Sequence, residues 1–246
     1  MPIFKKEEES LWSSTPRAMG PFRGLHGGAL AGLLSAELEM IAADQGLGIA
    51  TSASVQFLRP TTGGALQTIP ETVRRGRRAS ILTNRIVQNG QPTAVATIVF
   101  IQPMSIPVEA RSEAPDAEPA ELSVLPARAA PHGGPWMMDN FDVRISEAGI
   151  FWFRYKDGIV DGMTPMARVL GPADWTHGLR RPRRPQLADP NVSMQISLSR
   201  HPEGEYIGIL PATRWTGQGI GFGEGKLYDQ SGDIGRVIMS VALTPV

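Results

Sequence analysis

The segment best suited to chemistry is Gly24-Leu25-His26-Gly27-Gly28-Ala29, which directly precedes a predicted helix. The first N–H groups of a helix have no partner inside it and lie at the positive end of its dipole. Glycine lets a ligand approach such groups closely, so Gly27 and Gly28 could polarise a carbonyl or stabilise an oxyanion, with His26 donating a hydrogen bond beside them. A turn in which glycine only relieves crowding, with a structural histidine, explains the same residues.

Asp174 is the second candidate, near the end of another predicted helix. A solvated carboxylate is the plain interpretation. Partial burial beside Leu170 and Trp175 would raise its pKa and favour a role as a general base.

Other kinds of reactive centre find little support. The chain of 246 residues has no cysteine, which excludes disulfides, thiolate metal sites and a cysteine nucleophile. It has no Gly-x-Ser-x-Gly segment, which disfavours a serine hydrolase. Its four histidines lack the spacing of metal ligands, so we expect neither a metal nor another cofactor.

Two arginine clusters form local basic patches in a chain with 24 Lys+Arg and 24 Asp+Glu. The first contains Arg74, Arg75, Arg77 and Arg78, and the second contains Arg180, Arg181, Arg183 and Arg184. Guanidinium groups match phosphates well, although a solvated charged turn is the alternative for either cluster. The balanced net charge argues against a nucleic-acid partner.

The elements that must position these residues follow from periodicity. Leucines recurring at three- and four-residue steps predict a helix over Ala29–Ala43, and Thr164-Pro165 predicts the start of a second over Pro165–Thr176. Alternation and turn residues predict strands. These are Ser52–Leu58, Leu66–Arg74, Ala79–Gln88, Thr93–Gln102, Phe141–Ile145, Gly149–Tyr155, Val192–Ser199, Tyr206–Trp215, Gly219–Tyr228 and Gly235–Leu243. The alternating glycines from Gly217 to Gly225 leave one strand face without side chains, for a packed helix or an acyl chain, and we favour packing.

The two halves share this order of elements. A shift of 141 residues aligns Ser52 with Ser193 and Gly63 with Gly204, which indicates a tandem duplication. We therefore predict an N-terminal unit over residues 1–102 and a C-terminal unit over 136–246. Residues 103–135, interrupted by seven prolines, are predicted to be a surface linker.

Several short motifs together resemble a known family. They are His-Gly-Gly before a long helix, the strand end Phe57-Leu58-Arg59-Pro60, Ala173-Asp174-Trp175 on the second helix, and Leu227-Tyr228-Asp229 followed by Ile234-Gly235-Arg236. The duplicated layout resembles the double-hotdog acyl-CoA thioesterases of the thioesterase II type, over nearly all of the chain outside the linker. The resemblance implies an α+β tandem hotdog, in which each unit is a curved antiparallel sheet wrapped around a central helix.

The resemblance also implies site residues. In that family an Asp of the second helix, with a Thr or Asn and a Gln, activates the water that attacks the thioester, and these positions fall on Asp174, on Asn191, and on Met239 or Ser240. Neither of the last two is Gln. His26, Gly27 and Gly28 would then bind the thioester carbonyl, and Arg75, Arg77 and Arg181 could contact the phosphates of CoA. Glu37 of the first helix is expected on another face, so the first half lacks an acid of its own.

The function expected from this resemblance is hydrolysis of acyl-CoA to the free acid and CoA, as in fatty acid metabolism. The missing Gln leaves a non-catalytic acyl-CoA-binding protein as the alternative. No apolar stretch approaches the ~20 residues of a membrane-spanning helix, and the N-terminus lacks the apolar core of a signal peptide. We therefore expect a cytoplasmic protein without a membrane partner, and the sequence leaves a homo-oligomer open.

Overall fold

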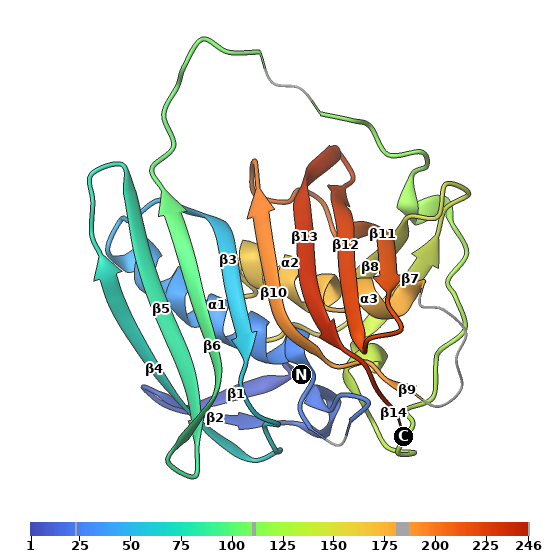
Figure 1. Cartoon of the computed structure of the whole chain (residues 1–246). Helices are drawn as coiled ribbons and strands as arrows, with labels where there is room; N and C mark the ends of the chain where they lie inside the picture. The colour runs from blue at the N-terminus through green and yellow to red at the C-terminus, as the bar shows by residue number, and fades with distance from the viewer. Residues whose placement is uncertain (23, 110–111, 181–186, 246) are drawn as a thin grey trace.

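The protein folds around one continuous antiparallel sheet. The computed structural model describes residues 1–22, 24–109, 112–180 and 187–245. Within these ranges the main sheet has twelve strands in the order β1-β2-β4-β5-β6-β3-β10-β13-β12-β11-β8-β7, and the helices lie behind it in Figure 1. A small second sheet pairs β14 with β9.

The strands of the first half are β1 (Phe4–Glu8), β2 (Leu11–Ser14), β3 (Ile49–Phe57), β4 (Ala65–Arg74), β5 (Ala79–Gln88) and β6 (Gln91–Ile101). Those of the second half are β7 (Phe141–Ile145), β8 (Phe151–Tyr155), β9 (Leu187–Ala188), β10 (Asn191–Leu198), β11 (Tyr206–Trp215), β12 (Ile220–Asp229), β13 (Gly232–Ala242) and β14 (Thr244–Pro245). The helices are α1 (Gly27–Asp44), α2 (Pro165–Ala173) and α3 (Thr176–Leu179), with short 3-10 turns η1 (Pro16–Ala18), η2 (Pro119–Glu121) and η3 (Met137–Asn140).

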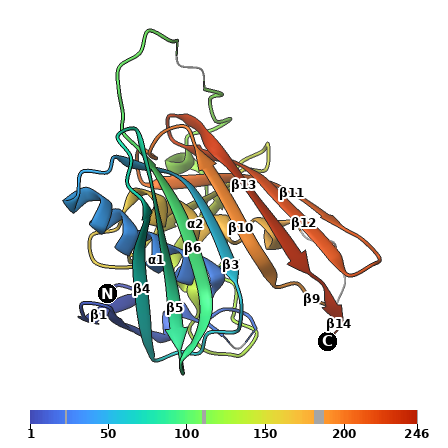
Figure 2. The ribbon, with the colours of Figure 1, turned by 60° about the vertical axis from the view of Figure 1, so that its left-hand side comes forward.

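Each half contains a hairpin, a helical segment and then four long strands. The first half has β1–β2, α1 and β3–β6, and the second has β7–β8, α2 with α3, and β10–β13. The helices α1 and α2 lie on the same side of the sheet, as Figure 2 shows from a second direction. This arrangement agrees with the two predicted units, each a sheet around a central helix.

The two halves meet along the antiparallel pair β3–β10. Ser54 lies opposite Gln195, with Ser52 opposite Ser197 and Gln56 opposite Ser193. Residue 195 is also the counterpart of residue 54 under the 141-residue shift that relates the halves. A residue that pairs with its own counterpart marks a local two-fold axis, so the halves are joined as in a symmetric dimer.

The core is continuous through both units. Four leucines of the predicted stripe, Leu30, Leu33, Leu34 and Leu38, are buried, and only Ile41 is partly exposed. Burial of each such side chain stabilises the fold by about 1.5–3 kcal/mol. The sheet and α2 enclose α1 on nearly all sides. This packing fixes the position of the whole helix, including the residues at its two ends.

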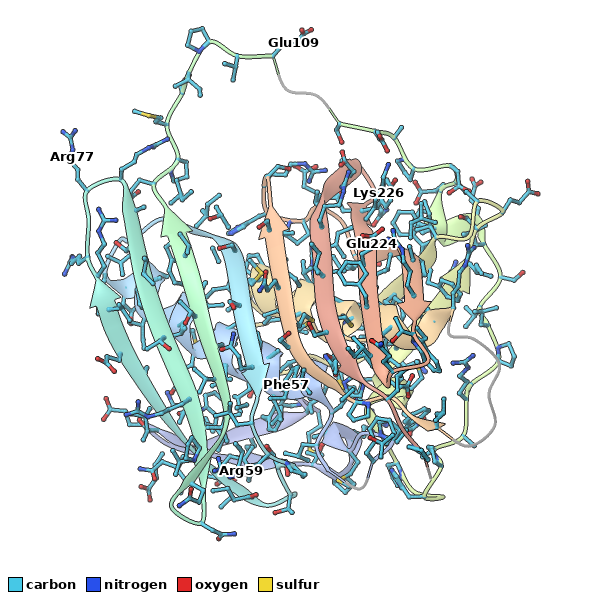
Figure 3. The ribbon with its side chains drawn as sticks, in the orientation of Figure 1. Phe57, Arg59, Arg77, Glu109, Glu224 and Lys226 are labelled. Atoms are coloured by element: carbon cyan, nitrogen blue, oxygen red, sulfur yellow. The ribbon has the colours of Figure 1, made fainter. Side chains whose placement is uncertain are left out.

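The connector, residues 103–135, forms no named strand in its described part. Figure 1 shows it arching from β6 over the upper edge, and Figure 3 labels Glu109 near its highest point. Its second part is attached to the C-terminal half, because Glu113 accepts a hydrogen bond from Lys226 at 2.8 Å and the guanidinium of Arg144 donates to the carbonyl of Leu122 at 2.8 Å. The unit boundaries at 102 and 136 stay predictions.

The prediction that the alternating glycines share one strand face is correct for Gly221, Gly223 and Gly225 on β12 but wrong for Gly217 and Gly219, which lie in the turn before it. Gly223 and Gly225 have a packing role. A Cβ on Gly223 would lie 2.8 Å from Cγ of Met239 and 3.2 Å from Cβ of His177, and one on Gly225 would lie 3.2 Å from Cγ2 of Thr176. These distances are too short for a larger side chain, so α3 can lie directly on β12. None of the described helices is long and apolar enough to cross a membrane.

Candidate active site

The carboxylate of Asp174 lies at the junction of three segments that are distant in sequence. Asp174 caps the C-terminus of α2, is only 3% exposed and points to the first turn of α1. The N–H of Gly28 donates to its Oδ2 at 2.7 Å, and the side-chain amide of Asn191 donates to its Oδ1 at 2.7 Å. The structure therefore brings together Asp174, Asn191 and the glycine loop.

The close approach of the α2 backbone requires a glycine at position 28, while Gly27 faces the ends of two side chains. A Cβ on Gly28 would lie 2.5 Å from the carbonyl oxygen of Gly171, and one on Gly27 would lie 2.9 Å from Oδ2 of Asp174 and from Cζ of Phe57. The Gly28 N–H already donates its hydrogen bond to the carboxylate of Asp174. Gly27 is the first helical residue, so its N–H has no partner within α1 and remains the candidate donor for a carbonyl oxygen.

His26 is the N-cap of α1 and a buried neutral group. Its Nδ1 accepts from the Gly28 N–H at 3.1 Å and lies 3.1 Å from Oδ2 of Asp174. Its ring stacks on Trp175 at 4.3 Å between centroids, and Trp136 meets Trp175 edge-on at 5.5 Å. Burial lowers the pKa of His26 to about 3, so it carries no charge at neutral pH.

Burial acts in the opposite direction on the acid. It raises the pKa of Asp174, while the charge of His177 and the hydrogen bonds from Asn191 and Gly28 partly oppose that rise. A carboxylate whose pKa is raised toward the working pH is a stronger base than a solvated one. The environment of Asp174 is therefore suited to accepting a proton from water.

The site lies beside the end of β3 and the start of β10. Gln56 pairs with Ser193, which places Phe57 and Asn191 near one another on adjacent strands. Figure 3 shows Phe57 at the lower end of β3, with Arg59 beyond it. Arg59 is exposed and donates to the carbonyl of Pro92 at 2.9 Å.

A second buried carboxylate, Glu39 of α1, lies at the N-terminus of α2. It accepts hydrogen bonds from the N–H groups of Met166 (3.0 Å) and Ala167 (3.3 Å) and from the hydroxyls of Ser35 and Thr164. Glu39 was not predicted from the sequence, and the first half was expected to have no acid of its own. One feature of the sequence could have indicated it. Glu39 follows Ser35 by one helical turn, so the two side chains lie together on a helix face that is otherwise apolar.

Glu37, in contrast, has a local structural partner. Its carboxylate is buried and accepts from the side-chain amide of Asn84 on β5 at 2.8 Å. This agrees with the expectation that Glu37 lies on another face from the site.

The structure does not bring the predicted arginines to Asp174. Arg75 donates to the carbonyl of Gln45, which caps the far end of α1. A helix of 18 residues is about 27 Å long, so Arg75 lies roughly that far from Gly28. Figure 3 shows Arg77 at the same upper edge of the sheet. Arg181 lies outside the described residues.

The two positions at which a Gln was expected also provide no polar group to the carboxylate. Met239 is buried beside Gly223, and Ser240, its neighbour on β13, is exposed on the opposite face of the sheet. In the described part of the chain, no three His, Asp or Glu side chains gather closely enough to hold a metal ion.

Two family models match the two halves of the chain. The family model for the acyl-CoA thioesterase N-terminal domain matches residues 15–101, and the model for the C-terminal domain of the same family matches residues 103–238. No curated protein matches the chain by sequence.

Solved structures with the same architecture cover almost the whole chain. A conserved protein of unknown function with a hotdog fold from Alicyclobacillus acidocaldarius aligns with a TM-score of 0.76 and 18% identity, over 99% of this chain and 96% of that one. An acyl-CoA thioesterase II from Mycobacterium marinum aligns with a TM-score of 0.70 and 16% identity, over 99% and 95% of the two chains. At such identities the likeness concerns the fold, and it confirms the predicted tandem hotdog.

Proposed function

The chain belongs to the acyl-CoA thioesterase family, and from this premise we propose that it hydrolyses acyl-CoA thioesters to the free acid and CoA with a water activated by Asp174. The observation that carries the proposal is the buried carboxylate of Asp174, held against the first turn of α1 by Gly28 and Asn191. Family membership supports thioester hydrolysis in general, and the assignment of the base is our own.

The hydrogen bonds of Asp174 leave room for a water. An ionised carboxylate can accept about four hydrogen bonds, and in the described part of the chain Gly28 and Asn191 supply two short ones. Asp174 would take a proton from water as the oxygen bonds to the carbonyl carbon. The oxyanion would accept from the Gly27 N–H, and its collapse would break the C–S bond and return the proton to the CoA sulfur.

The neighbours of Asp174 have positioning roles in this scheme. Asn191 holds Oδ1 so that the second lone pair of that oxygen is directed to the water. His26, being neutral, caps α1 and with Trp175 forms a dry wall beside the carboxylate. Exclusion of bulk water by these rings matters because a carboxylate surrounded by apolar groups is poorly solvated, and poor solvation is what raises its pKa.

The test is release of free thiol from a panel of acyl-CoAs by the wild type and by Asp174→Asn. We expect turnover to fall by at least tenfold, since a positioned general base contributes typically ~10²–10⁴-fold. Asp161→Asn, an exposed aspartate, is the matched control and should retain full turnover. A fully active Asp174→Asn enzyme would place the base elsewhere.

The absence of the expected Gln favours one alternative function, binding of acyl-CoA without hydrolysis. If the wild type binds acyl-CoA by calorimetry but releases no thiol from any member of the panel, the protein is a non-catalytic acyl-CoA binder. Met239, whose side chain is apolar and buried, is the residue that supports this outcome.

A further inference from the structure

A cavity of about 300 Å³ lies beneath the connector, where residues 124–128 run beside β7. The N–H of Leu125 donates to the carbonyl of Val143 at 2.7 Å, which fixes the connector to the edge of the sheet at this point. Leu125, Val143, Phe151 and Leu179 line the cavity and are half-buried, so apolar surface faces this space.

The cavity adjoins the wall of the candidate active site. Trp136 and Trp175, which form that wall with His26, each bind a cavity-lining residue. The indole N–H of Trp136 donates to the carbonyl of Arg128 at 3.0 Å, and the carbonyl of Trp175 accepts from the N–H of Leu179 at 3.1 Å. Leu179 is five residues after Asp174, about 7–8 Å along a helical path.

The two acidic side chains that line the cavity, Asp139 and Asp142, each have a hydrogen-bond donor. Asp142 accepts from Arg154 at 2.6 Å and lies 3.6 Å from Lys156, while Asp139 accepts from the N–H of Trp136 at 3.0 Å. The remaining surface is mainly hydrocarbon. A volume near 300 Å³ is at the lower end for ligand pockets, a size that suits an alkyl chain better than a nucleotide.

We propose that this cavity receives the apolar end of the acyl group, so that the connector determines the chain-length preference. The inference rests on the proposed function, since it needs the thioester carbonyl at Gly27 and Asp174. The acyl chain would pass the tryptophan wall and end between Leu125 and Phe151. Burial of each methylene changes a binding constant by about fourfold, so a long chain should bind much more tightly than a short one.

The experiment is calorimetric binding of S-butyl-CoA and S-dodecyl-CoA, thioethers that contain no bond to hydrolyse. The wild type should bind the dodecyl compound more than tenfold more tightly. Leu125→Trp, which fills the cavity, should reduce the ratio of the two binding constants by at least tenfold, and Ala127→Trp, on the same wall, provides a second variant if the first misfolds. Val108→Trp, an exposed position of the connector outside the cavity, should keep the wild-type ratio.

The outcomes separate the cavity from the catalytic proposal. An unchanged ratio in both cavity variants, or no chain-length dependence in the wild type, overturns the cavity assignment even if the enzyme hydrolyses acyl-CoA. An equal loss for both ligands also overturns it, since the cavity would then hold the CoA part. A ratio that collapses in the cavity variants supports the assignment even if no acyl-CoA is hydrolysed.

Discussion

Asp174 and Glu39 cap each other's helices: the carboxylate at the end of α2 binds the first turn of α1, and the carboxylate in α1 binds the first turn of α2. The two contacts run in opposite directions between the same pair of helices. Among the described residues, Glu39 accepts four hydrogen bonds, three at Oε2 and one at Oε1, whereas Asp174 accepts two short ones from Gly28 and Asn191. Three of the four donors to Glu39 belong to the N-cap and first turn of α2, so this carboxylate serves to cap that helix.

Glu39→Gln should therefore affect stability and spare catalysis. The amide NH₂ would face donors from α2, and a buried group without its partner costs about 1–3 kcal/mol. For a chain of this length the melting temperature should fall by roughly 2–4 °C per kcal/mol. Thermal unfolding and thiol release, measured on the same preparation, should show a lower Tm with turnover close to that of the wild type.

The reverse pattern would change the interpretation of the first half. If Glu39→Gln kept its Tm but lost turnover as Asp174→Asn does, Glu39 would be a second catalytic base. Ser35→Ala, which removes one of the four donors to Glu39, is the milder companion variant and should lower the Tm by less.

The pH dependence of hydrolysis should have a single acidic limb. Burial raises the pKa of Asp174, and only the ionised form can take a proton from water, so kcat/KM should rise with pH through that raised pKa and then level off. His26, with its pKa lowered to about 3, should add no limb near neutrality. A bell-shaped profile centred near neutral pH would show that a further group titrates in the mechanism.

Asn191→Leu should displace that limb to higher pH. The amide of Asn191 donates to the ionised carboxylate and so holds the pKa of Asp174 down against burial. Without this donor the charged form is less stable, the pKa rises further and more of the acid stays protonated at a given pH. The rate profile should shift toward alkaline pH, and a profile that only decreases in height would assign Asn191 a purely steric role.

Much of the sheet could be predicted because buried and more exposed residues alternate along several of its strands, most clearly β5, β10 and β13. β5, β7 and β11 occur at the predicted bounds, and α1 is only slightly longer than predicted. The hairpin β1–β2 was missed because β1 contains Lys5, Lys6, Glu7 and Glu8, which are all exposed. On these two strands only Phe4 and Trp12 are buried. Two buried residues are too few to give the alternation of apolar and polar residues that predicts a strand.

Of the residues that gather at the candidate site, only those belonging to a recognisable sequence motif were predicted. The His26-Gly27-Gly28 loop stands out locally, whereas the resemblance supplied the roles of Asp174 and Asn191. Glu39 could not be assigned in this way, because its partners on α2 lie over 120 residues away and the sequence does not say which acid of α1 faces them. The arginines near Arg75 are a cluster in sequence, but the length of α1 separates them from the carboxylate.

Limited proteolysis should cut first in the connector near residues 104–108. Met104, Ile106 and Val108 are more than half exposed, and the hydrogen bonds that hold the connector begin further along, at Ser112 and Glu113. The two fragments should stay together in size-exclusion chromatography, because the β3–β10 pairing and the contact between α1 and α2 do not depend on the connector. Early cuts inside the strands of both halves would contradict the two-unit organisation.

Asp229→Asn should destabilise the C-terminal half and weaken its dependence on acid. Asp229 is fully buried, and burial alone would raise its pKa. Hydrogen bonds from the guanidinium of Arg200 and from the N–H groups of Glu203 and Ser231 have the larger effect. The pKa of Asp229 therefore lies below its ordinary value of 3.8. A carboxyl whose pKa is lowered by folding stabilises the protein above pH 3.8, and this contribution disappears as the pH falls through the lowered pKa. Removing one partner of such a pair costs about 3 kcal/mol. Denaturant unfolding at neutral pH should show this loss, and the difference between variant and wild type should shrink in acid; a constant difference at all pH values would assign the loss to packing alone.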